Sequence, residues 1–243
     1  MDLSLDIGNT TAKAGWFEQG QLQDVQAGVS PAELAVFIRE RSTSRAILSS
    51  VAGSVASWQA VIPKDCPYTI LSNTTPLPFQ NSYDTPATLG TDRIAAVAGA
   101  QVRFPHRNVL VIDAGTCITY DLLTDQGTYL GGMISPGLQM RWQAMHTFTA
   151  RLPLVAVESP EAAKGASIIG KSTEESLKSG GLLGMAAEID QIIRRYADKF
   201  AALQVVTCGG DMKYLQPLVL SKHIYIPELV LIGLNSIVRH EGS

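Results

Sequence analysis

The stretch Asp6-Ile7-Gly8-Asn9-Thr10 near the start of the chain has a counterpart in Asp113-Ala114-Gly115-Thr116. Each copy follows an apolar run of the kind that forms a buried strand. A further glycine, Gly20 or Gly127, stands fourteen residues after each aspartate, so the pattern repeats at an offset of 107 residues. This repeat predicts a duplicated domain in which each copy contains a β-hairpin.

The first turn of each hairpin is suited to binding an anion. Glycine lets the backbone approach closely, amide and threonine groups donate to phosphate oxygens, and a carboxylate holds a metal ion or its waters. A single Asp-x-Gly is a common turn, and the chain has neither a Walker A loop nor a Rossmann glycine fingerprint. Two copies in register, with Thr10, Thr11 and Lys13 after the first and Thr119 and Asp121 after the second, indicate more than a turn.

These features favour the two-lobed ATPase arrangement of actin and the sugar kinases. The predicted fold class is α/β, a duplicated actin-like (ribonuclease H-like) kinase fold. We expect an N-terminal lobe over residues 1–107 and a C-terminal lobe over residues 108–243. Two facing hairpin turns would then hold a polyphosphate from both sides.

Composition excludes several classes of protein. With 243 residues, 46% of them hydrophobic, the chain has enough apolar material for a buried core. The formal net charge of -3 and the lack of basic runs argue against nucleic acid or an anionic membrane as a partner. No apolar stretch is long enough to cross a bilayer. We therefore expect a cytoplasmic protein.

Cysteine and histidine give no sign of a disulfide framework or a zinc site. Cys66, Cys117 and Cys208 form no C-x-x-C pair, and their odd number indicates reduced, structural thiols. The four histidines lie far apart in the sequence, so any metal should have oxygen ligands.

Hydrophobic periodicity predicts alternating strands and helices. Strands are expected near residues 3–6, 13–17, 22–27, 46–50, 68–71, 109–113, 118–123, 127–134 and 205–208. Helices are expected near residues 31–41, 54–62, 91–100, after 137, 174–196 and 227–239. Thr91 and Thr173 are each placed to cap a helix. Residues 72–90 read as an ordered surface loop of a length that is usually functional.

Asp92 and Arg93 open the helix after this loop. Asp92 is either a first-turn acid that complements the helix dipole or a general base that takes the proton of an attacking alcohol. Arg93 would then bind an anionic group through its planar fork. Lys13 is either a solvated edge residue or a phosphate contact, and its closeness to Asp6 in sequence favours the second. The role of Tyr83, packing or substrate contact, stays open.

The sequence resembles the type III pantothenate kinases over essentially its whole length. The shared elements are Asp6-x-Gly8-Asn9-Thr10-x-x-Lys13, Tyr83, Gly90-x-Asp92-Arg93, Asp113-x-Gly115-Thr116-x-x-Thr119-x-Asp121, Thr173, Ser179-Gly180 and Gly209-Gly210. The Gly-x-Asp-Arg element is the specific part, because other actin-like ATPases share only the hairpins. One departure is Cys208, which stands where the family usually has threonine before the diglycine.

The resemblance implies a role for each of these residues. ATP phosphates would be bound by Asp6, Gly8, Asn9, Thr10, Thr11 and Lys13, with Thr116 as a further ATP contact. Asp92 would be the catalytic base. Pantothenate would be contacted by Tyr83, Gly90, Thr91, Asp92, Arg93 and Thr173. Asp113 would bind a monovalent cation, K⁺ or NH₄⁺, which the family needs besides Mg²⁺.

The expected activity is therefore ATP-dependent phosphorylation of pantothenate to 4'-phosphopantothenate, the first step of coenzyme A biosynthesis. A homodimer is expected, both from the resemblance and from apolar helices near residues 94–100 and 182–193. One alternative is a small sugar or polyol kinase with the same hairpins. The other is a nucleotide-dependent regulator or chaperone-like ATPase, which would leave Asp92 and Arg93 without a task.

Overall fold

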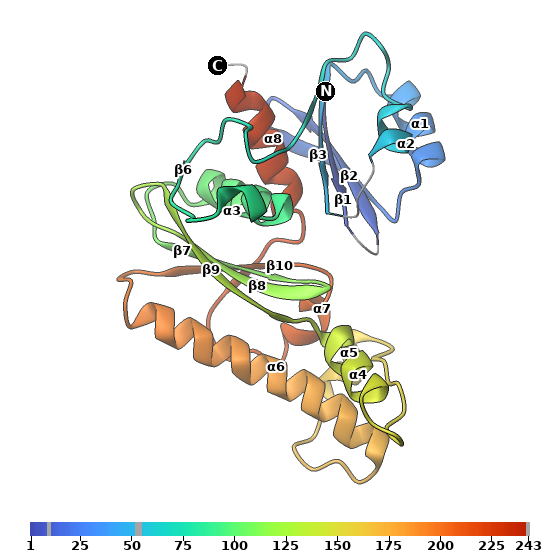
Figure 1. Ribbon diagram of the computed structural model, residues 1–243, viewed down its shortest axis with the longest axis vertical. Helices are drawn as coiled ribbons and strands as arrows, with labels where there is room; N and C mark the ends of the chain where they lie inside the picture. Colours follow the sequence, from blue (N-terminus) through green and yellow to red (C-terminus); the bar gives the residue numbers. More distant parts are fainter. Residues whose placement is uncertain (9–10, 52–54, 242–243) are drawn as a thin grey trace. The chain divides into compact units, whose positions relative to one another are not determined.

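The computed structural model describes residues 1–8, 11–51 and 55–241 of an α/β protein with two sheets (Figure 1). Packing divides the chain into two compact units. Unit 1 comprises Met1–His106, Leu123–Gly131 and Glu228–Ser243, and unit 2 comprises Arg107–Leu122 and Gly132–Pro227. Unit 1 thus includes two later segments of the chain, whereas each predicted lobe is one continuous range. The division into lobes at residues 107 and 108 stays a prediction.

Unit 1 contains a five-stranded sheet in the order β3-β2-β1-β4-β5. The strands are β1 (Asp2–Ile7), β2 (Ala12–Glu18), β3 (Gln21–Ala27), β4 (Arg45–Ser50) and β5 (Tyr68–Ile70). Strand β1 pairs antiparallel with β2 and parallel with β4, so the predicted first hairpin is confirmed. The sequence Asp6-Ile7-Gly8 therefore stands at the end of a central strand.

Helices α1 (Pro31–Glu40) and α2 (Ala56–Gln59) lie on one side of this sheet (Figure 1). Ser30 and Glu33 form a capping box at the start of α1, and buried Leu34 and Ile38 join the core with the fully buried Trp16. The helix predicted over 54–62 is wrong in length, because the helical turns of α2 stop at Gln59, before Pro63.

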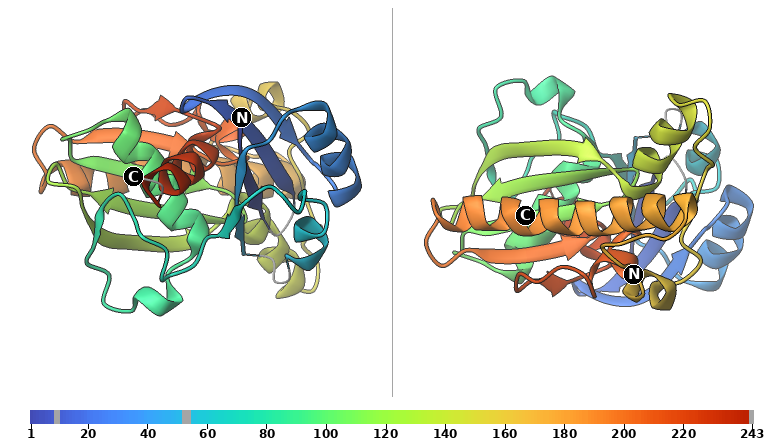
Figure 2. Two further views of the ribbon diagram at one scale, coloured as in Figure 1. Left: turned by 90° about the horizontal axis from the view of Figure 1, so that it is seen from above. Right: turned by 90° about the horizontal axis from the view of Figure 1, so that it is seen from below.

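Helices α3 (Thr91–Arg103) and α8 (Leu229–Glu241) pack backbone against backbone (Figure 2). A Cβ on Gly99 would lie 2.2 Å from the Leu229 carbonyl oxygen, and one on Gly233 would lie 1.7 Å from the Ala95 carbonyl oxygen. Every residue from 93 to 100 is buried. The apolar surface of α3 is buried against α8 of the same chain. It therefore does not support the homodimer that we expected from this helix.

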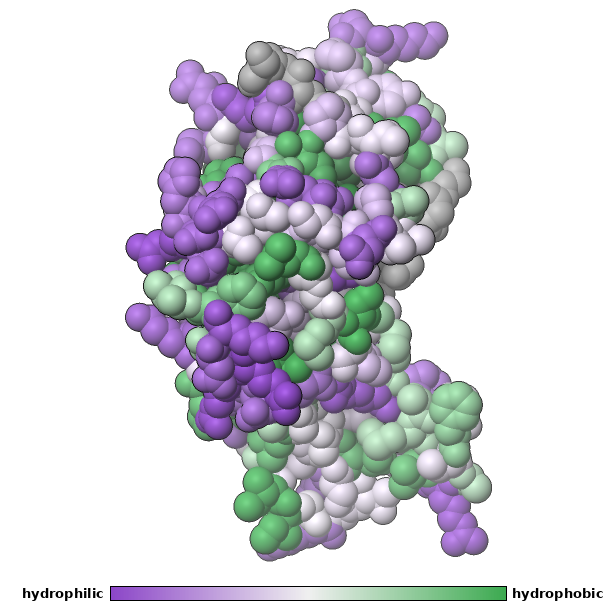
Figure 3. All heavy atoms as spheres, turned by 60° about the vertical axis from the view of Figure 1, so that its left-hand side comes forward, coloured by the Kyte–Doolittle hydropathy of each residue, from purple (hydrophilic) through white to green (hydrophobic). Residues whose placement is uncertain are grey.

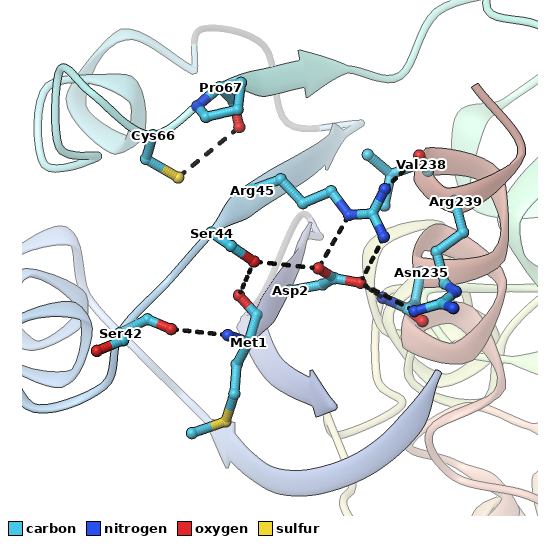
Figure 4. A network of polar contacts seen from close by, with 10 residues as sticks. All are labelled: Met1, Asp2, Ser42, Ser44, Arg45, Cys66, Pro67, Asn235, Val238 and Arg239. Atoms are coloured by element: carbon cyan, nitrogen blue, oxygen red, sulfur yellow. Dashed lines mark hydrogen bonds and ion pairs between the residues drawn. The ribbon is translucent and has the colours of Figure 1, made fainter. Parts of the chain in front are cut away.

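The N-terminus is tied to α8 by a polar network around Asp2 (Figure 4). The buried Asp2 carboxylate accepts hydrogen bonds from Arg45 (2.9 and 3.1 Å) and Asn235 (3.3 Å), and Arg239 lies 3.5 Å away. Burial alone would raise the pKa of Asp2, but the Arg45 guanidinium and its neighbours outweigh it and lower that pKa. The Met1 ammonium donates to the Ser42 carbonyl at 2.7 Å.

The second sheet has six strands in the order β11-β10-β7-β8-β9-β6. The outer strand β6 (Gln80–Asn81) and residues 128–131 of β9 belong to unit 1, and most of the other strand residues belong to unit 2. The strands after β6 in the sequence are β7 (Val109–Ala114), β8 (Cys117–Leu123), β9 (Thr128–Pro136), β10 (Gln204–Cys208) and β11 (Ile224–Tyr225). The long helix α6 (Thr173–Ala197) runs along this sheet (Figure 1). The core of unit 2 buries its apolar residues Leu182, Met185, Ala186, Ile189 and Ile193, so these residues do not supply the exposed apolar surface from which we expected a homodimer.

The remaining helices of unit 2 are α4 (Leu138–Thr147), α5 (Pro160–Lys164) and α7 (Met212–Leu215). The second hairpin copy is confirmed in β7 and β8, which are neighbours in the sheet. The short elements α5, α7 and β11 were not predicted. Within the expected loop 72–90, the structure places β6 (Gln80–Asn81) and the 3-10 turn η1 (Pro86–Thr88).

Two predicted caps are wrong. The N-cap of α3 is Gly90 and no side chain caps it, whereas the N-cap of α6 is Ser172, whose hydroxyl accepts from the Glu175 amide.

Hydrophobic side chains reach the surface in small patches between hydrophilic ones on the face shown in Figure 3. In the part of the chain that the structure describes, no helix is both long and apolar enough to span a membrane.

Candidate active site

Asp6 and Lys13 face one another across the first hairpin. They are directly paired in the β1–β2 register, and both are half-buried. Burial and the nearby negative charge of Asp92 raise the pKa of Asp6 to about 6, while the Lys13 ammonium opposes this rise. The expected closeness of Lys13 to the motif is confirmed, and Lys13 lies on an inner strand rather than an edge.

The turn that follows Asp6 closes tightly around Gly8. Its amide donates to the Thr11 carbonyl at 3.1 Å, and a Cβ on Gly8 would lie 3.1 Å from that same oxygen. Thr11 is exposed, as a phosphate contact should be. Asn9 and Thr10, which we expect to contribute to the same turn, lie outside the described residues.

Asp92 stands in the first turn of α3, close enough to Asp6 for the two charges to interact. Its Oδ1 accepts a hydrogen bond from the Arg93 amide at 2.8 Å. Unit 1 therefore joins the end of β1 and the start of α3 into a cluster of two carboxylates and the Lys13 ammonium. Such a cluster can hold a hydrated cation and phosphate oxygens while keeping one carboxylate available as a proton acceptor.

The start of α3 is also attached to the sheet. The Ser49 hydroxyl donates to the Thr91 hydroxyl over 2.9 Å, and Ser49 lies beside Asp6 in the β1–β4 register. Sequence reasoning missed Ser49. A buried hydroxyl at the end of an apolar strand is the signal that could have found it.

Tyr83 and Arg93 come together on one side of Asp92's helix. The Arg93 guanidinium carbon lies 5.7 Å from the centre of the Tyr83 ring, and Arg93 is only 6% exposed. The ring also stacks on Tyr129 at 6.1 Å and packs on Gly131, whose φ of +96° and missing Cβ make room for it. Tyr83 thus has a packing role, and its contact with the substrate stays a prediction.

The second motif is organised in unit 2 by the diglycine turn. A Cβ on Gly209, which has φ of +91°, would lie 2.4 Å from Oδ1 of Asp113. The Asp211 amide donates to the Ala114 carbonyl at 2.9 Å, and the Asp211 carboxylate accepts from the Leu138 amide at 3.2 Å. Burial raises the pKa of Asp211. Gly209 is therefore required for space beside Asp113.

Thr116 and Thr173 are both exposed residues of unit 2. The Thr116 carbonyl accepts from the Gly137 amide at 3.2 Å, which fixes the turn. Thr173 begins α6 and borders a groove of about 800 Å³ between α4 and α6. The other groove residues are Pro136, Met140, Arg141, Ala144, Met145, Phe148, Leu152, Ser176, Leu177, Gly180 and Gly181.

Among the described residues, no group of three or more histidine, cysteine or acidic side chains is placed to hold a metal ion. Asp6 of unit 1 offers a carboxylate, and Asp113 of unit 2 offers another. A single carboxylate such as that of Asp6 fits Mg²⁺, which is usually held by one or two carboxylates together with water and substrate phosphates. Cys66 and Cys208 are buried, and Cys66, Cys117 and Cys208 are free thiols in the structure.

The family model of the type III pantothenate kinases matches residues 2–195. The chain belongs to this family. A type III pantothenate kinase of Christiangramia forsetii is 40% identical over 98% of each chain, and one of Porphyromonas gingivalis is 37% identical over 98% of each chain. This assignment to the type III pantothenate kinases decides against the sugar kinase and regulator alternatives.

Solved structures confirm the predicted actin-like fold. A Campylobacter jejuni structure described as a Baf family transcriptional activator has a TM-score of 0.63 at 21% identity, over 99% of this chain and 98% of that one. The activator of a Clostridium difficile 2-hydroxyisocaproyl-CoA dehydratase, crystallised with ADPNP, has a TM-score of 0.55 at 11% identity, over 99% and 94%. At these sequence identities, the likeness shows only that this type III pantothenate kinase shares the fold of those proteins.

Proposed function

We propose that the protein transfers the γ-phosphoryl group of ATP to the primary hydroxyl of pantothenate. The product is 4'-phosphopantothenate, so the reaction is the first step of coenzyme A biosynthesis. The observation that carries the proposal is the convergence of Asp6, Lys13 and Asp92 in unit 1. It supplies a cation, a carboxylate for a metal ion and a proton acceptor, within a chain of the matching family.

Asp92 is the proposed general base. As the pantothenate oxygen attacks the γ-phosphorus, Asp92 takes the proton of that hydroxyl, and the bond from the phosphorus to the bridging oxygen of ADP breaks. Lys13 and the turn around Gly8, with Asn9, Thr10 and Thr11, hold the phosphates. Asp6 holds Mg²⁺ or its waters, and the bound ion supplies neutralisation of phosphate charge. Catalysis then rests on positioning and electrostatics.

The acceptor is proposed to contact Tyr83, Gly90, Thr91, Arg93 and Thr173. Arg93 is suited to a carboxylate, because its guanidinium offers two parallel donors in a fixed plane. Its burial against the Tyr83 ring holds that plane in one orientation. Pantothenate carries one carboxylate and an apolar gem-dimethyl group, and an arginine beside an aromatic ring suits both.

Three further proposals rest on the family resemblance. Thr116 is a second ATP contact, Asp113 binds K⁺ or NH₄⁺, and the active enzyme is a cytoplasmic homodimer. The close fit of Gly209 against Asp113 supports a carboxylate kept in one place. Light scattering of the active enzyme tests the dimer, and a monomeric mass would reject it.

Phosphorylation by the purified protein tests the function. Production of ADP is followed with pantothenate, with a panel of sugars and polyols, and with no acceptor, each with and without K⁺. We expect turnover with pantothenate only, and its loss in Asp92→Asn. Turnover with a sugar but not pantothenate would overturn the proposed substrate.

A further inference from the structure

Ser49 and Thr91 form a hydrogen bond between two elements that are 42 residues apart in sequence. Ser49 is on β4 and is fully buried, with 0% exposure. Thr91 is the first residue of α3, and Asp92 follows it directly. The bond therefore connects the sheet strand next to Asp6 with the turn that carries Asp92.

The first turn of α3 has no side-chain cap. Its N-cap is Gly90, which has no side chain to bond the free amides of the helix start. The Asp92 carboxylate accepts from the Arg93 amide of the same turn, so this bond does not connect the turn to the sheet. The bond between Ser49 and Thr91 does connect them, and it restrains how the first turn is rotated on the sheet.

We propose that Ser49 is a positioning residue that holds Asp92 in its reactive place through Thr91. This inference rests on the proposed role of Asp92 as the base. Ser49 touches no reacting atom; it acts by fixing Thr91, and with it the backbone from which the Asp92 side chain extends. A base that is displaced by a fraction of an ångström loses alignment with the hydroxyl proton.

Ser4 shows that a buried serine in this sheet does not by itself imply such a role. It lies on β1, is also 0% exposed, and its hydroxyl has no hydrogen-bond partner among the described residues. Its Cα is paired with Gly15 and Ile47 in the neighbouring strands. Ser4→Ala is therefore a matched control for Ser49→Ala, with the same substitution, burial and sheet but no bond to α3.

The test compares the steady-state kinetics of the two variants in the full chain. We expect Ser49→Ala to lower kcat about three- to tenfold, the range for loss of one neutral hydrogen bond, with the KM for ATP unchanged. Ser4→Ala should retain the kcat of the unaltered enzyme. Chemical unfolding of both variants verifies that they fold. Equal kcat in Ser49→Ala and Ser4→Ala would overturn the proposal.

A double-mutant cycle with Thr91 identifies the path of the effect. Thr91→Val removes the hydroxyl that accepts from Ser49, and because Thr91 is also a proposed pantothenate contact, the informative quantity is the further effect of Ser49→Ala in that background. In the Thr91→Val background, Ser49→Ala should cause no further fall in kcat. If the effects of Ser49→Ala and Thr91→Val on kcat multiply instead, Ser49 has a general structural role that does not act through Thr91. Asp92→Asn separates the role of Asp92 as the base from the role of Ser49 as a positioning residue. If Asp92→Asn stays active, the assignment of the base fails. If Asp92→Asn is inactive but Ser49→Ala has the kcat of the unaltered enzyme, only the role of Ser49 is rejected.

Discussion

Oδ1 of Asp92 lies 2.5 Å from the point at which a side chain on Gly90 would begin. Gly90 has φ of −61° and ψ of 135°, an ordinary extended conformation that any residue adopts. A side chain at position 90 would therefore have to displace the Asp92 carboxylate, so the glycine matters for space rather than for backbone freedom. This gives the Gly-x-Asp-Arg element a physical reason: the first residue leaves room for the carboxylate of the third.

Gly90→Ala should consequently displace Asp92 while leaving the fold intact. We expect kcat to fall roughly 10- to 100-fold, because small misplacements of a reacting group cost up to about 10²-fold. The KM for ATP should change little. Gly184→Ala is the matched control, since a Cβ there meets nothing within 4 Å on an exposed face of α6. An active Gly90→Ala enzyme would show that Asp92 tolerates movement.

Asp92→Asn removes a proton acceptor from a side chain of nearly the same shape. We expect turnover to drop by ~10²–10⁴, the usual contribution of general-base catalysis, with ATP binding retained. Single-turnover kinetics together with an ATP-binding titration measure the two effects separately. Nearly unchanged turnover would contradict the assignment of the base.

Asp6 should make the ligand-free protein less stable as pH rises. Its pKa is about 6 when folded, above the ordinary value of 3.8, so the folded state binds the proton more tightly than the unfolded state. The associated stability is fully present below pH 3.8 and is lost as pH rises through about 6.

Asp6→Asn cannot lose that stability, because its side chain does not ionise. We compare the free energy of unfolding of Asp6→Asn with that of the unaltered protein. The difference should change in favour of Asp6→Asn by about 1–3 kcal/mol between pH 4 and pH 7.5. Urea unfolding at the two pH values without nucleotide measures this. The same variant should bind Mg-ATP more weakly. A stability difference that is constant with pH would contradict the raised pKa.

Arg93→Lys should be more damaging than its conserved charge suggests. Lysine offers a point contact in place of two parallel donors, and it cannot stack its head on the Tyr83 ring in the same way. We expect the KM for pantothenate to rise with that for ATP little changed. Steady-state kinetics with each substrate varied in turn provide the measurement. An unchanged KM for pantothenate would reject the contact, and a rise for ATP alone would move Arg93 to the phosphates.

Asp113→Ala should abolish or greatly weaken activation by K⁺. The carboxylate is the proposed ligand of the monovalent cation, and without it the ion would lose its charged partner. Activity measured against K⁺ concentration at constant ionic strength tests this, with Asp190→Asn as a control. Asp190 is an aspartate of unit 2 that is more buried than the half-buried Asp113, and its carboxylate accepts from the Leu220 and Ser221 amides. An unaltered K⁺ response in Asp113→Ala would give Asp113 another task.

The repeated hairpins were predictable because strand, turn glycine and aspartate are encoded locally. The pairing of Asp6 with Lys13 follows from the tight turn between β1 and β2. The burial of Arg93 was not predictable, because it depends on Tyr83 and Gly131, which come from distant segments. The contact of Ser49 was not predictable for the same reason, because its partner Thr91 is 42 residues away in the sequence.

Helix ends and interfaces were predicted less well than strands. Thr91 fits the pattern of a cap, yet Gly90 takes that position and the Thr91 hydroxyl bonds to Ser49 instead. The apolar residues of α3 indicated a subunit interface. They are covered by α8, and sequence gives no sign that residues near 99 and 233 meet through glycines.

The packing of α8 against α3 and β1 has a consequence for biosynthesis. Unit 1 begins with Met1 but needs Leu229–Glu241, which a ribosome makes only after the whole of unit 2. Until then, the Ala95–Gly99 face of α3 and the Asp2 carboxylate lack their partners from α8. Unit 1 of the nascent chain therefore stays incomplete until α8 has been made, so synthesis of Leu229–Glu241, rather than of Asp6, Lys13 and Asp92, completes its packing.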